Sequence, residues 1–462
     1  MQGGEIMDFI EKFFKLKENN TNIKTEMIAG ISTFMTMAYI LAVNPSILSA
    51  TGMDAGAIFT ATAISSALAC LFMAFFSNYP FALAPAMGPN AFFAYTVVKQ
   101  MGYSWETALA AVFIEGILFL ILSLTKVRKA IFNCIPFSLK LGISGGVALF
   151  IAFIGLVNAH IITAGPTIVQ FFPFHKAIAE GTMRSMGTGV ILAVAGTLIT
   201  ALLMKHKVKG SILFGIFITW ILGMICQLAG LYIPDPQAGM MSVIPAFKAN
   251  MSVPSLSPLF LKMDFSSVLS LNFISIVFAF MFVDIFDTLG TLIGIGAKSG
   301  FLDSEGHLDK MNGALLADSL GTICGAMLGT STVSTYVESS AGTADGGRTG
   351  LTACFVALLF ILSLPFASVF LSVPSFATAP ALIVVGFMIF SGVKINFENM
   401  SEGFPAYIAM LVMPLSYSIS DGIACGVISY TALNLFSPGD RKKLNPVIYV
   451  LSILFVLKYF FF

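Results

Sequence analysis

Long apolar stretches separated by short polar segments fill most of this chain. A helix needs about 20 predominantly apolar residues to cross a bilayer, and the stretches have roughly that length. They fall at 28–49, 56–77, 81–98, 106–124, 137–157, 188–204 and 210–230, and again at 270–294, 311–328, 330–343, 349–371, 378–392, 403–414 and 416–436. The pattern predicts an all-α polytopic membrane protein with about fourteen transmembrane spans in two sets of seven.

The number of spans in each set decides how the two sets are oriented. Seven crossings bring the chain to the opposite side of the membrane, so the second set runs inverted relative to the first, as in many secondary transporters. The predicted parts are a cytoplasmic amphipathic N-terminus, a first inverted repeat, an extracytoplasmic connecting loop, a second inverted repeat, and a basic tail with an apolar helix. They cover 1–27, 28–230, 231–269, 270–436 and 437–462, respectively. The last apolar run, 447–462, is short for a span and is predicted to lie at the membrane interface.

The third span of each set is interrupted by residues that disfavour a helix. Pro85 and Pro89 each lack a backbone donor, and the Thr/Ser/Val run at 330–335 favours extended chain. Non-helical backbone at membrane depth is tolerated where it lines a cavity or is buried in protein. Interruptions at matching positions of two repeats mark the binding site of a transporter. We therefore expect short extended segments in spans 3 and 10 that meet at one central site.

Charge is sparse, and its position along the chain carries the information. Of the 462 residues, 57% are hydrophobic and 10% are charged, and the net charge of +1 offers no basic field for nucleic acid. The basic clusters all fall on one side of the predicted spans, at Lys12–Lys24, Lys126–Lys129, Lys205–Lys209 and Arg441–Lys443. By the positive-inside rule, both ends of the fourteen-span unit face the cytoplasm, which predicts a multi-pass protein of the plasma membrane.

The sequence lacks the residue patterns that an intramembrane enzyme or a metal site requires. The six cysteines are scattered singly, and no cluster has metal-ligand spacing, so we predict no metal and no cofactor. The four histidines, His160, His175, His206 and His307, fall in predicted loops and are not available to activate a nucleophile inside the membrane.

Several carboxylates lie within otherwise apolar spans. An ionised side chain at the bilayer centre costs roughly 2.5 to 3.5 kcal/mol, so such groups persist where they face a cavity or a partner. Asp287 and Glu338 are the leading functional candidates, and the alternative is a structural pair at a helix break. Because the histidines lie in loops, proton transfer would rest on carboxyls. The candidates are Asp284, Asp287, Asp318 and Glu338, with Glu115 as a further acid, and both Asp318 and Glu115 could instead link helices.

Four strings of residues carry a family resemblance. They are Gly30–Pro45, Phe282–Thr291 (Phe-Val-Asp-Ile-Phe-Asp-Thr-Leu-Gly-Thr), Gly329–Ser339 and Gly346–Thr352. Together they resemble the azaguanine-type purine permeases, a branch of the nucleobase-cation symporter 2 (xanthine/uracil permease) family. The resemblance implies core and gate domains and proton-coupled uptake of a purine base. It also implies that Asp287 and Glu338 hold the base and that Asn90 and Phe92 of span 3 face its ring.

The chemistry of these side chains suits a planar substrate with N–H donors. An ionised carboxylate only accepts hydrogen bonds, so Glu338 matches the N–H edge of guanine or hypoxanthine better than adenine. The hydroxyls of Ser331, Thr332 and Thr335 can bond the rest of the ring, and Phe92 or Phe93 can stack on its face. Thr291 stands where uracil-type relatives carry a histidine, and it completes the predicted substrate-binding set.

The prediction is a purine importer, not an enzyme, that uses proton symport and works by alternating access in the lipid bilayer. Adenine as substrate and sodium as coupling ion remain the alternatives, since carboxylates and broken-helix carbonyls also suit sodium. A channel or anion transporter of the same general fold is disfavoured by the acidic centre. Analogy with proteins of this fold suggests a homodimer.

Overall fold

A computed structural model describes residues 2–124, 136–165, 168–234, 242–244, 252–266, 268, 270–301, 308–436 and 445–461. The basic clusters Lys126–Lys129 and Arg441–Lys443 and the predicted loop histidine His307 lie outside the described residues.

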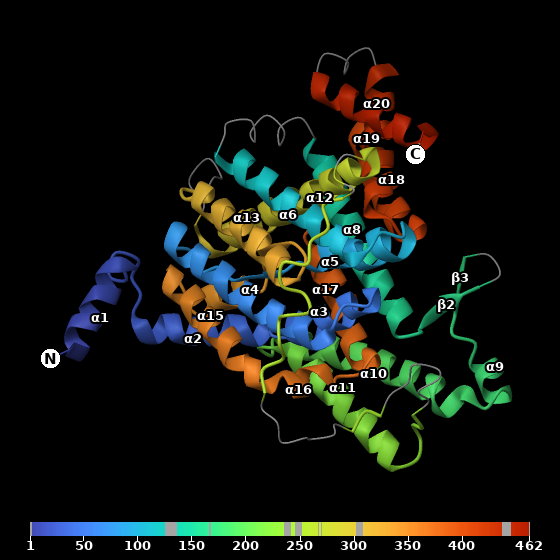
Figure 1. Ribbon diagram of the computed structural model, residues 1–462, viewed down its shortest axis with the longest axis horizontal. Coiled ribbons are helices and arrows are strands. Elements are labelled where there is room, and N and C mark those ends of the chain that lie inside the picture. Colours follow the sequence, from blue (N-terminus) through green and yellow to red (C-terminus); the bar gives the residue numbers. More distant parts are fainter. Residues whose placement is uncertain are drawn as a thin grey trace.

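In its described residues, the first half of the chain is mostly helical and contains three short strands (Figure 1). Its helices are α1 (Gln2–Phe13), α2 (Ile23–Met37), α3 (Ile40–Leu48), α4 (Ala55–Phe76), α5 (Met87–Ala91), the π-helix η2 (Phe92–Gln100), α6 (Trp105–Leu124), α8 (Phe137–Asn158), α9 (Phe174–Ala179), α10 (Met186–Lys205) and α11 (Ser211–Leu228). Its strands are β1 (Leu83–Pro85), β2 (Ile162–Ala164) and β3 (Val169–Phe171).

The second half repeats the same kinds of element. It contains α12 (Leu271–Ser299), α13 (Met311–Leu328), β4 (Val333–Thr335), α14 (Ser339–Ala344), α15 (Gly350–Ser363), α16 (Ala367–Leu371), α17 (Ser375–Ser391), α18 (Met400–Ser416), α19 (Ile419–Phe436) and α20 (Pro446–Phe461). Within the described ranges, nine helices are long and apolar enough to cross a membrane. The predicted membrane-helix class and the extended segments in spans 3 and 10 are confirmed.

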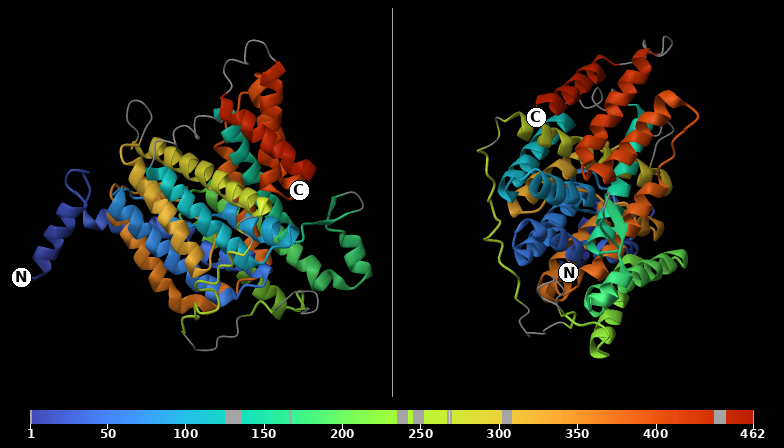
Figure 2. Two further views of the ribbon diagram at one scale, coloured as in Figure 1. Left: turned by 45° about the horizontal axis from the view of Figure 1, so that its top comes forward. Right: turned by 90° about the vertical axis from the view of Figure 1, so that its right-hand side faces the viewer.

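The helices form two groups that differ in what they pack against. In the group that we call the core, α4 packs against α13 and α15, α6 against α12 and α13, and α2 against α14 and α15. In the group that we call the gate, α17 packs against α8, α10 and α11, and α18 against α8 and α19. The left view of Figure 2 shows the core helices side by side, with α18, α19 and α20 at an angle on one edge. Each group combines helices from both halves of the chain.

The two interrupted spans meet in a short antiparallel sheet inside the core. Strand β1 pairs with β4 in the register Leu83↔Thr335, Ala84↔Ser334 and Pro85↔Val333. Two flanking bonds extend the ladder, from Ala86 N to Thr332 O and from Tyr336 N to Ala82 O, each 2.9 Å long. Because the strands satisfy one another's backbone groups, extended chain can persist at the centre of a helical membrane protein. Both half-helices, α5 and α14, start beside this sheet.

A buried carboxylate joins the first span to the eleventh. Glu26 on α2 is fully buried and accepts from the backbone N–H groups of Arg348 (2.9 Å) and Thr352 (3.1 Å). It also accepts from the Thr352 hydroxyl at 2.6 Å. These donors surround the start of α15, where the first N–H groups of a helix have no partner within the helix and favour an anion. Glu26 thus caps α15 from a neighbouring helix.

We expect Glu26→Gln to destabilise the fold by about 2 to 3 kcal/mol, because an amide replaces a charged acceptor that serves several buried donors. The melting temperature of the detergent-purified protein, followed by size-exclusion chromatography after heating, measures this loss. Glu398→Gln, at an exposed position before α18, is the matched control and is expected to melt like the parent protein. Equal melting temperatures for both variants would contradict the capping role.

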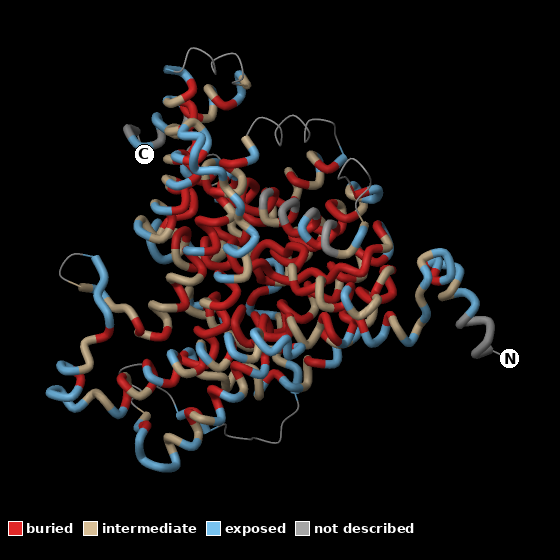
Figure 3. Tube along the Cα trace, turned by 180° about the vertical axis from the view of Figure 1, so that it is seen from behind, coloured by how far each residue is buried: buried red, intermediate tan, exposed pale blue. Residues whose placement is uncertain are grey.

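Close helix packing in the gate depends on residues without side chains. A Cβ at Gly142 would lie 2.5 Å from the Ala406 Cα atom of α18, and a Cβ at Gly146 would lie 2.4 Å from the Met413 sulfur. The four-residue spacing of these glycines is therefore explained by the contact between α8 and α18. Figure 3 shows the buried residues concentrated in the centre of the molecule, whereas residues 8–13 at the end of α1 are exposed or half-buried.

Candidate functional site

A cavity lies between the core and the gate, next to the β1–β4 sheet. On the core side it is lined by the chain around Met87, by Asp287 and Thr291 of α12, and by residues 334–338. On the gate side it is lined by apolar side chains of α8 and α17, namely Val147, Ile151, Val385, Met388 and Ile389. The cavity therefore has a polar wall on one helix group and an apolar wall on the other. This arrangement suits a flat molecule with a polar edge and apolar faces.

Asp287 reaches the cavity from the middle of α12. Its side chain is held by the hydroxyl of Ser334, which donates to Oδ2 at 3.0 Å. Ser334 is the central residue of β4, so the sheet register fixes the position of this donor. Thr291 lies one helical turn after Asp287 and also lines the cavity. The structure brings these two predicted residues together.

Glu338 lies three residues after the end of β4 and directly precedes α14. Its side chain is only 7% exposed, and Oε1 accepts a 2.8 Å hydrogen bond from the hydroxyl of Tyr39. Thr335, the last residue of β4, lines the same cavity. Four of the predicted substrate-binding residues, Asp287, Thr291, Thr335 and Glu338, therefore surround one space.

The other three predicted residues lie behind the cavity and do not line it. Asn90 is fully buried, and its Oδ1 accepts a hydrogen bond from Ser331. Phe92 packs edge-on against Phe280 of α12, with ring centroids 4.8 Å apart. Thr332 directs its hydroxyl to Glu115 at 3.4 Å. In this structure their contacts are with other core residues, and none of the three side chains lines the cavity.

A second layer of carboxyls lies behind Asp287. Glu115 of α6, Asp284 of α12 and Asp318 of α13 are all fully buried, and Glu115 and Asp284 lie close to one another, each with one oxygen that has no hydrogen-bond partner among the described residues. Thr288 donates to Asp318 Oδ2 at 3.0 Å, and the backbone N–H of Thr335 donates to Asp318 Oδ1 at 3.1 Å. Since an ionised carboxylate only accepts, the contact between Glu115 and Asp284 is a hydrogen bond when one of them carries a proton.

Hydrogen bonds connect this layer to the cavity. Thr335 joins Asp318 to the cavity wall, and Thr332 joins Glu115 to the sheet. Within the described ranges, no set of three or more His, Cys, Asp or Glu side chains is arranged to hold a metal ion.

Two polar residues at the site were not singled out from the sequence. Tyr39 lines the cavity from a break in the first span, and Ser334 supports Asp287. A signal for Tyr39 is present in the sequence, because Pro45 interrupts the helix pattern a short distance after it. Ser334 could have been found by assuming that the two interrupted spans pair as strands, which places every second side chain on the same face.

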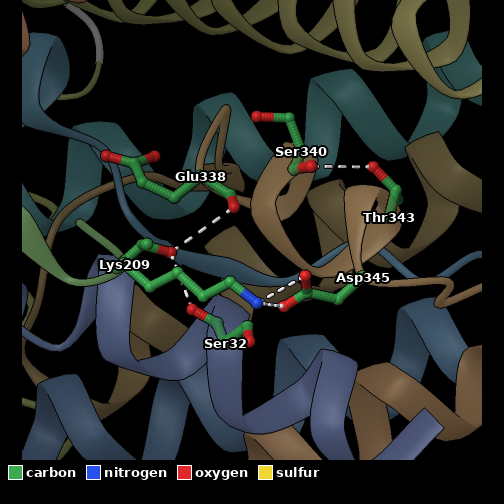
Figure 4. A network of polar contacts seen from close by, with 7 residues as sticks. Ser32, Lys209, Glu338, Ser340, Thr343 and Asp345 are labelled. Carbon is green, nitrogen blue, oxygen red and sulfur yellow. Dashed lines mark hydrogen bonds and ion pairs between the residues drawn. The ribbon is translucent and has the colours of Figure 1, made fainter. Parts of the chain in front are cut away.

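A second cavity of about 150 Å³ adjoins the first and shares Glu338 and Met388 with it. Its other lining residues include Thr36, Ser211 and Ser340. Near this cavity, Lys209 of the gate forms an ion pair with Asp345, which directly follows α14 of the core. Figure 4 shows the two side chains pointing toward one another. Among the ion pairs of the described residues, this one joins the core to the gate.

The model of the Permease family, Xan_ur_permease, matches residues 24–425. The chain belongs to the xanthine/uracil permease family. It is 46% identical to a putative permease of Methanocaldococcus jannaschii, over 98% of this chain and 99% of that one. It is 38% identical to the adenine permease AdeP of Escherichia coli, over 98% of this chain and 96% of AdeP. It is 39% identical to the guanine/hypoxanthine permease PbuG of Bacillus subtilis, over 98% of this chain and all of PbuG (100%).

The fold of this permease is also found among solved transporters. The transmembrane domain of a cyanobacterium bicarbonate transporter, BicA, superposes with a TM-score of 0.61 at 15% identity, over 87% of this chain and 97% of that domain. At this identity the similarity concerns the fold alone. Together the comparisons confirm the predicted family and the class of function: the protein is a multi-pass membrane nucleobase permease, and it is not an enzyme.

Proposed function

We propose that this permease imports purine nucleobases, with guanine and hypoxanthine as the favoured substrates, by proton symport. The observation that carries the proposal is the convergence of Asp287 and Glu338 on one cavity between two helix groups. Each carboxylate is oriented by a hydroxyl of the core, and the opposite wall is apolar. A purine ring presents N–H donors at its edge and apolar faces, which matches both walls.

The relatives support a purine substrate without separating the bases. Both adenine and guanine/hypoxanthine permeases resemble the chain to a similar degree. The acceptor character of Glu338 favours the bases with a ring N–H beside the six-membered-ring carbonyl, and adenine lacks that donor. A site whose buried acceptors need such donors discriminates strongly against bases without them. Adenine is the second candidate.

Coupling is assigned to carboxyls of the core. Asp287 and Glu338 line the cavity, whereas Asp284, Asp318 and Glu115 form the buried layer behind it. A proton held in that layer would lie close to the cavity, because the backbone N–H of Thr335, a residue of β4 that lines the cavity, donates to Asp318. By the positive-inside rule, the placement of basic residues favours an orientation in the cell membrane with Lys209 on the cytoplasmic side. A homodimer remains a prediction.

The decisive experiment is uptake of radiolabelled hypoxanthine into proteoliposomes with an inward proton gradient and no sodium. Unlabelled guanine, adenine, xanthine and uracil are added as competitors. Accumulation that follows the proton gradient and is blocked by guanine, but not by uracil, is expected. Accumulation that requires sodium would mean that sodium, not the proton, is the coupling ion. Competition by adenine alone would mean that adenine is the substrate.

Alternating access requires the gate to move against the core, so the Lys209–Asp345 pair is expected to affect its rate. Asp345 is 16% exposed and Lys209 60%, and such pairs contribute roughly 1 kcal/mol or less. We expect Lys209→Met to change the exchange rate about two- to fivefold and to abolish the dependence of that rate on ionic strength. Exchange of labelled hypoxanthine, measured at low and high salt, tests this.

The matched control for this prediction is Lys176→Met. Lys176 pairs with Glu180 at the end of α9, so this ion pair does not connect the core to the gate. Its exchange rate should respond to salt as the parent protein does. The same salt response in Lys209→Met and in the parent protein would show that the pair between core and gate does not influence the cycle.

A further inference from the structure

The first span contains a break of its own, beside the two interrupted spans. Helix α2 ends at Met37 and α3 begins at Ile40, with Pro45 inside α3. Proline cannot donate to the carbonyl four residues earlier and crowds the preceding turn. At the break, the backbone N–H groups of Ala42 and Val43 both bond to the carbonyl of Tyr39 at 3.0 Å. Tyr39 therefore lies in a tightened helical turn between α2 and α3.

The break places Tyr39 against Glu338. The Tyr39 side chain is 1% exposed and lines the cavity, and its hydroxyl donates to Glu338 Oε1 at 2.8 Å. One turn earlier, the hydroxyl of Thr36, which donates to the Thr33 carbonyl at 2.7 Å, lies 3.5 Å from the backbone carbonyl of Glu338. The first span thus contacts both the backbone and the carboxylate of the same residue.

A second tyrosine in the same cavity makes a different contact. The hydroxyl of Tyr336 donates to the backbone carbonyl of Pro85 at 2.5 Å, which joins the chain after β4 to β1. Tyr336 therefore supports the sheet, whereas Tyr39 supports a carboxylate. The two residues have the same chemistry, similar burial and one cavity, so they form a matched pair for comparison.

The contact with Tyr39 limits how the carboxylate can turn. The last torsion of a glutamate side chain has a broad, roughly two-fold profile, so the plane of a carboxylate without a fixed donor rotates easily. A phenol has a single O–H to donate, and here it goes to Oε1. With Oε1 held, the orientation of Oε2 is set before a substrate arrives. Such preorganisation removes a cost that the substrate would otherwise bear on binding.

We propose that Tyr39 is a positioning residue that sets the selectivity between purine bases by fixing the carboxylate of Glu338. The inference rests on the proposed function, in which Glu338 accepts hydrogen bonds from the base. Hypoxanthine offers one ring N–H on the edge that faces Glu338. A single hydrogen bond does not orient a carboxylate by itself, so hypoxanthine depends on an acceptor that is already oriented. Guanine offers the ring N–H and an adjacent amino group, and two parallel bonds can orient a free carboxylate by themselves.

The expected result follows from this difference. Tyr39→Phe removes only the hydroxyl, and it should weaken hypoxanthine binding about tenfold, whereas guanine binding weakens about threefold or less. The ratio of the two affinities therefore shifts toward guanine. Tyr336→Phe should change the affinities for both bases by the same factor. In a Glu338→Ala background, Tyr39→Phe should have no further effect on the ratio, because the acceptor that it positions is gone.

The experiment is competition of unlabelled guanine against labelled hypoxanthine on the purified full-length protein at equilibrium. The affinity ratio is independent of the fraction of correctly folded protein, so partial misfolding of a variant does not obscure the answer. Equal loss for both bases in Tyr39→Phe, matching Tyr336→Phe, would overturn the positioning role and leave the proposed function intact. Failure of the parent protein to bind either base would overturn the proposed function, and the role of Tyr39 with it.

Discussion

Replacing Glu338 with glutamine is expected to weaken purine binding about 100-fold while the protein still folds. The amide is similar in size to the carboxylate, and its oxygen can still accept from Tyr39. With the oxygen engaged there, the amino group faces the N–H edge of the base, so donors oppose donors. Losing a hydrogen bond to a charged acceptor costs about 1.5 to 3 kcal/mol, and an unpaired buried donor adds to that cost.

Equilibrium binding of labelled hypoxanthine to the purified variant measures this effect. Glu180→Gln is the control, because Glu180 is an exposed residue at the end of α9 that contacts only Lys176 among the ion pairs of the described residues. Glu180→Gln should bind like the parent protein. An unchanged affinity in Glu338→Gln would remove Glu338 from the binding site.

Replacing Asp287 with asparagine is expected to abolish concentrative uptake but to preserve exchange. Asparagine keeps a side-chain oxygen that can accept from Ser334, so the local geometry should persist. It cannot take up and release a proton, however, so the imposed proton gradient can no longer drive accumulation. Labelled hypoxanthine should then only equilibrate across the membrane, with accumulation reduced at least about tenfold.

Two measurements on the same proteoliposomes separate coupling from binding. Uptake driven by an inward proton gradient reports coupling, and counterflow against internal unlabelled base reports binding and movement of the gate. Full proton-driven accumulation in Asp287→Asn would assign coupling to the buried layer of Asp284, Asp318 and Glu115 instead. Loss of both proton-driven uptake and counterflow would show that Asp287 is needed for substrate binding or gate movement and not for coupling alone.

Much of the fold could be predicted because membranes impose strong constraints on sequence. Apolar length and the position of basic residues define the spans, and the predicted break in each third span is present in the structure. The prolines around β1 and the hydroxyl-rich run around β4 prevent continuous helices, so the sequence itself identifies where the two half-helices meet.

The direction in which individual side chains point was harder to predict. Asn90 lies on the five-residue helix α5, and Phe92 begins the π-helix η2, where the turn is wider than in an α-helix. The change of helix type at this point means that the usual 3.6-residue periodicity does not tell which side chain faces the cavity. Thr332 lies at the edge of a two-stranded sheet, and its orientation depends on the pairing register. Asp287 and Glu338 were easier to identify, because a carboxylate in an apolar span has few tolerable surroundings.

The β1–β4 sheet has a consequence for how the protein is made. Strand β1 is synthesised with the first repeat, but its pairing partner belongs to the second repeat, which leaves the ribosome much later. Backbone groups without partners are costly in lipid, so the newly inserted first repeat cannot be fully satisfied by its own residues. It must wait in contact with water, other helices or the insertion machinery until β4 arrives. Assembly of the centre of the molecule is therefore a late step of biogenesis, and the two repeats depend on each other from the moment of synthesis.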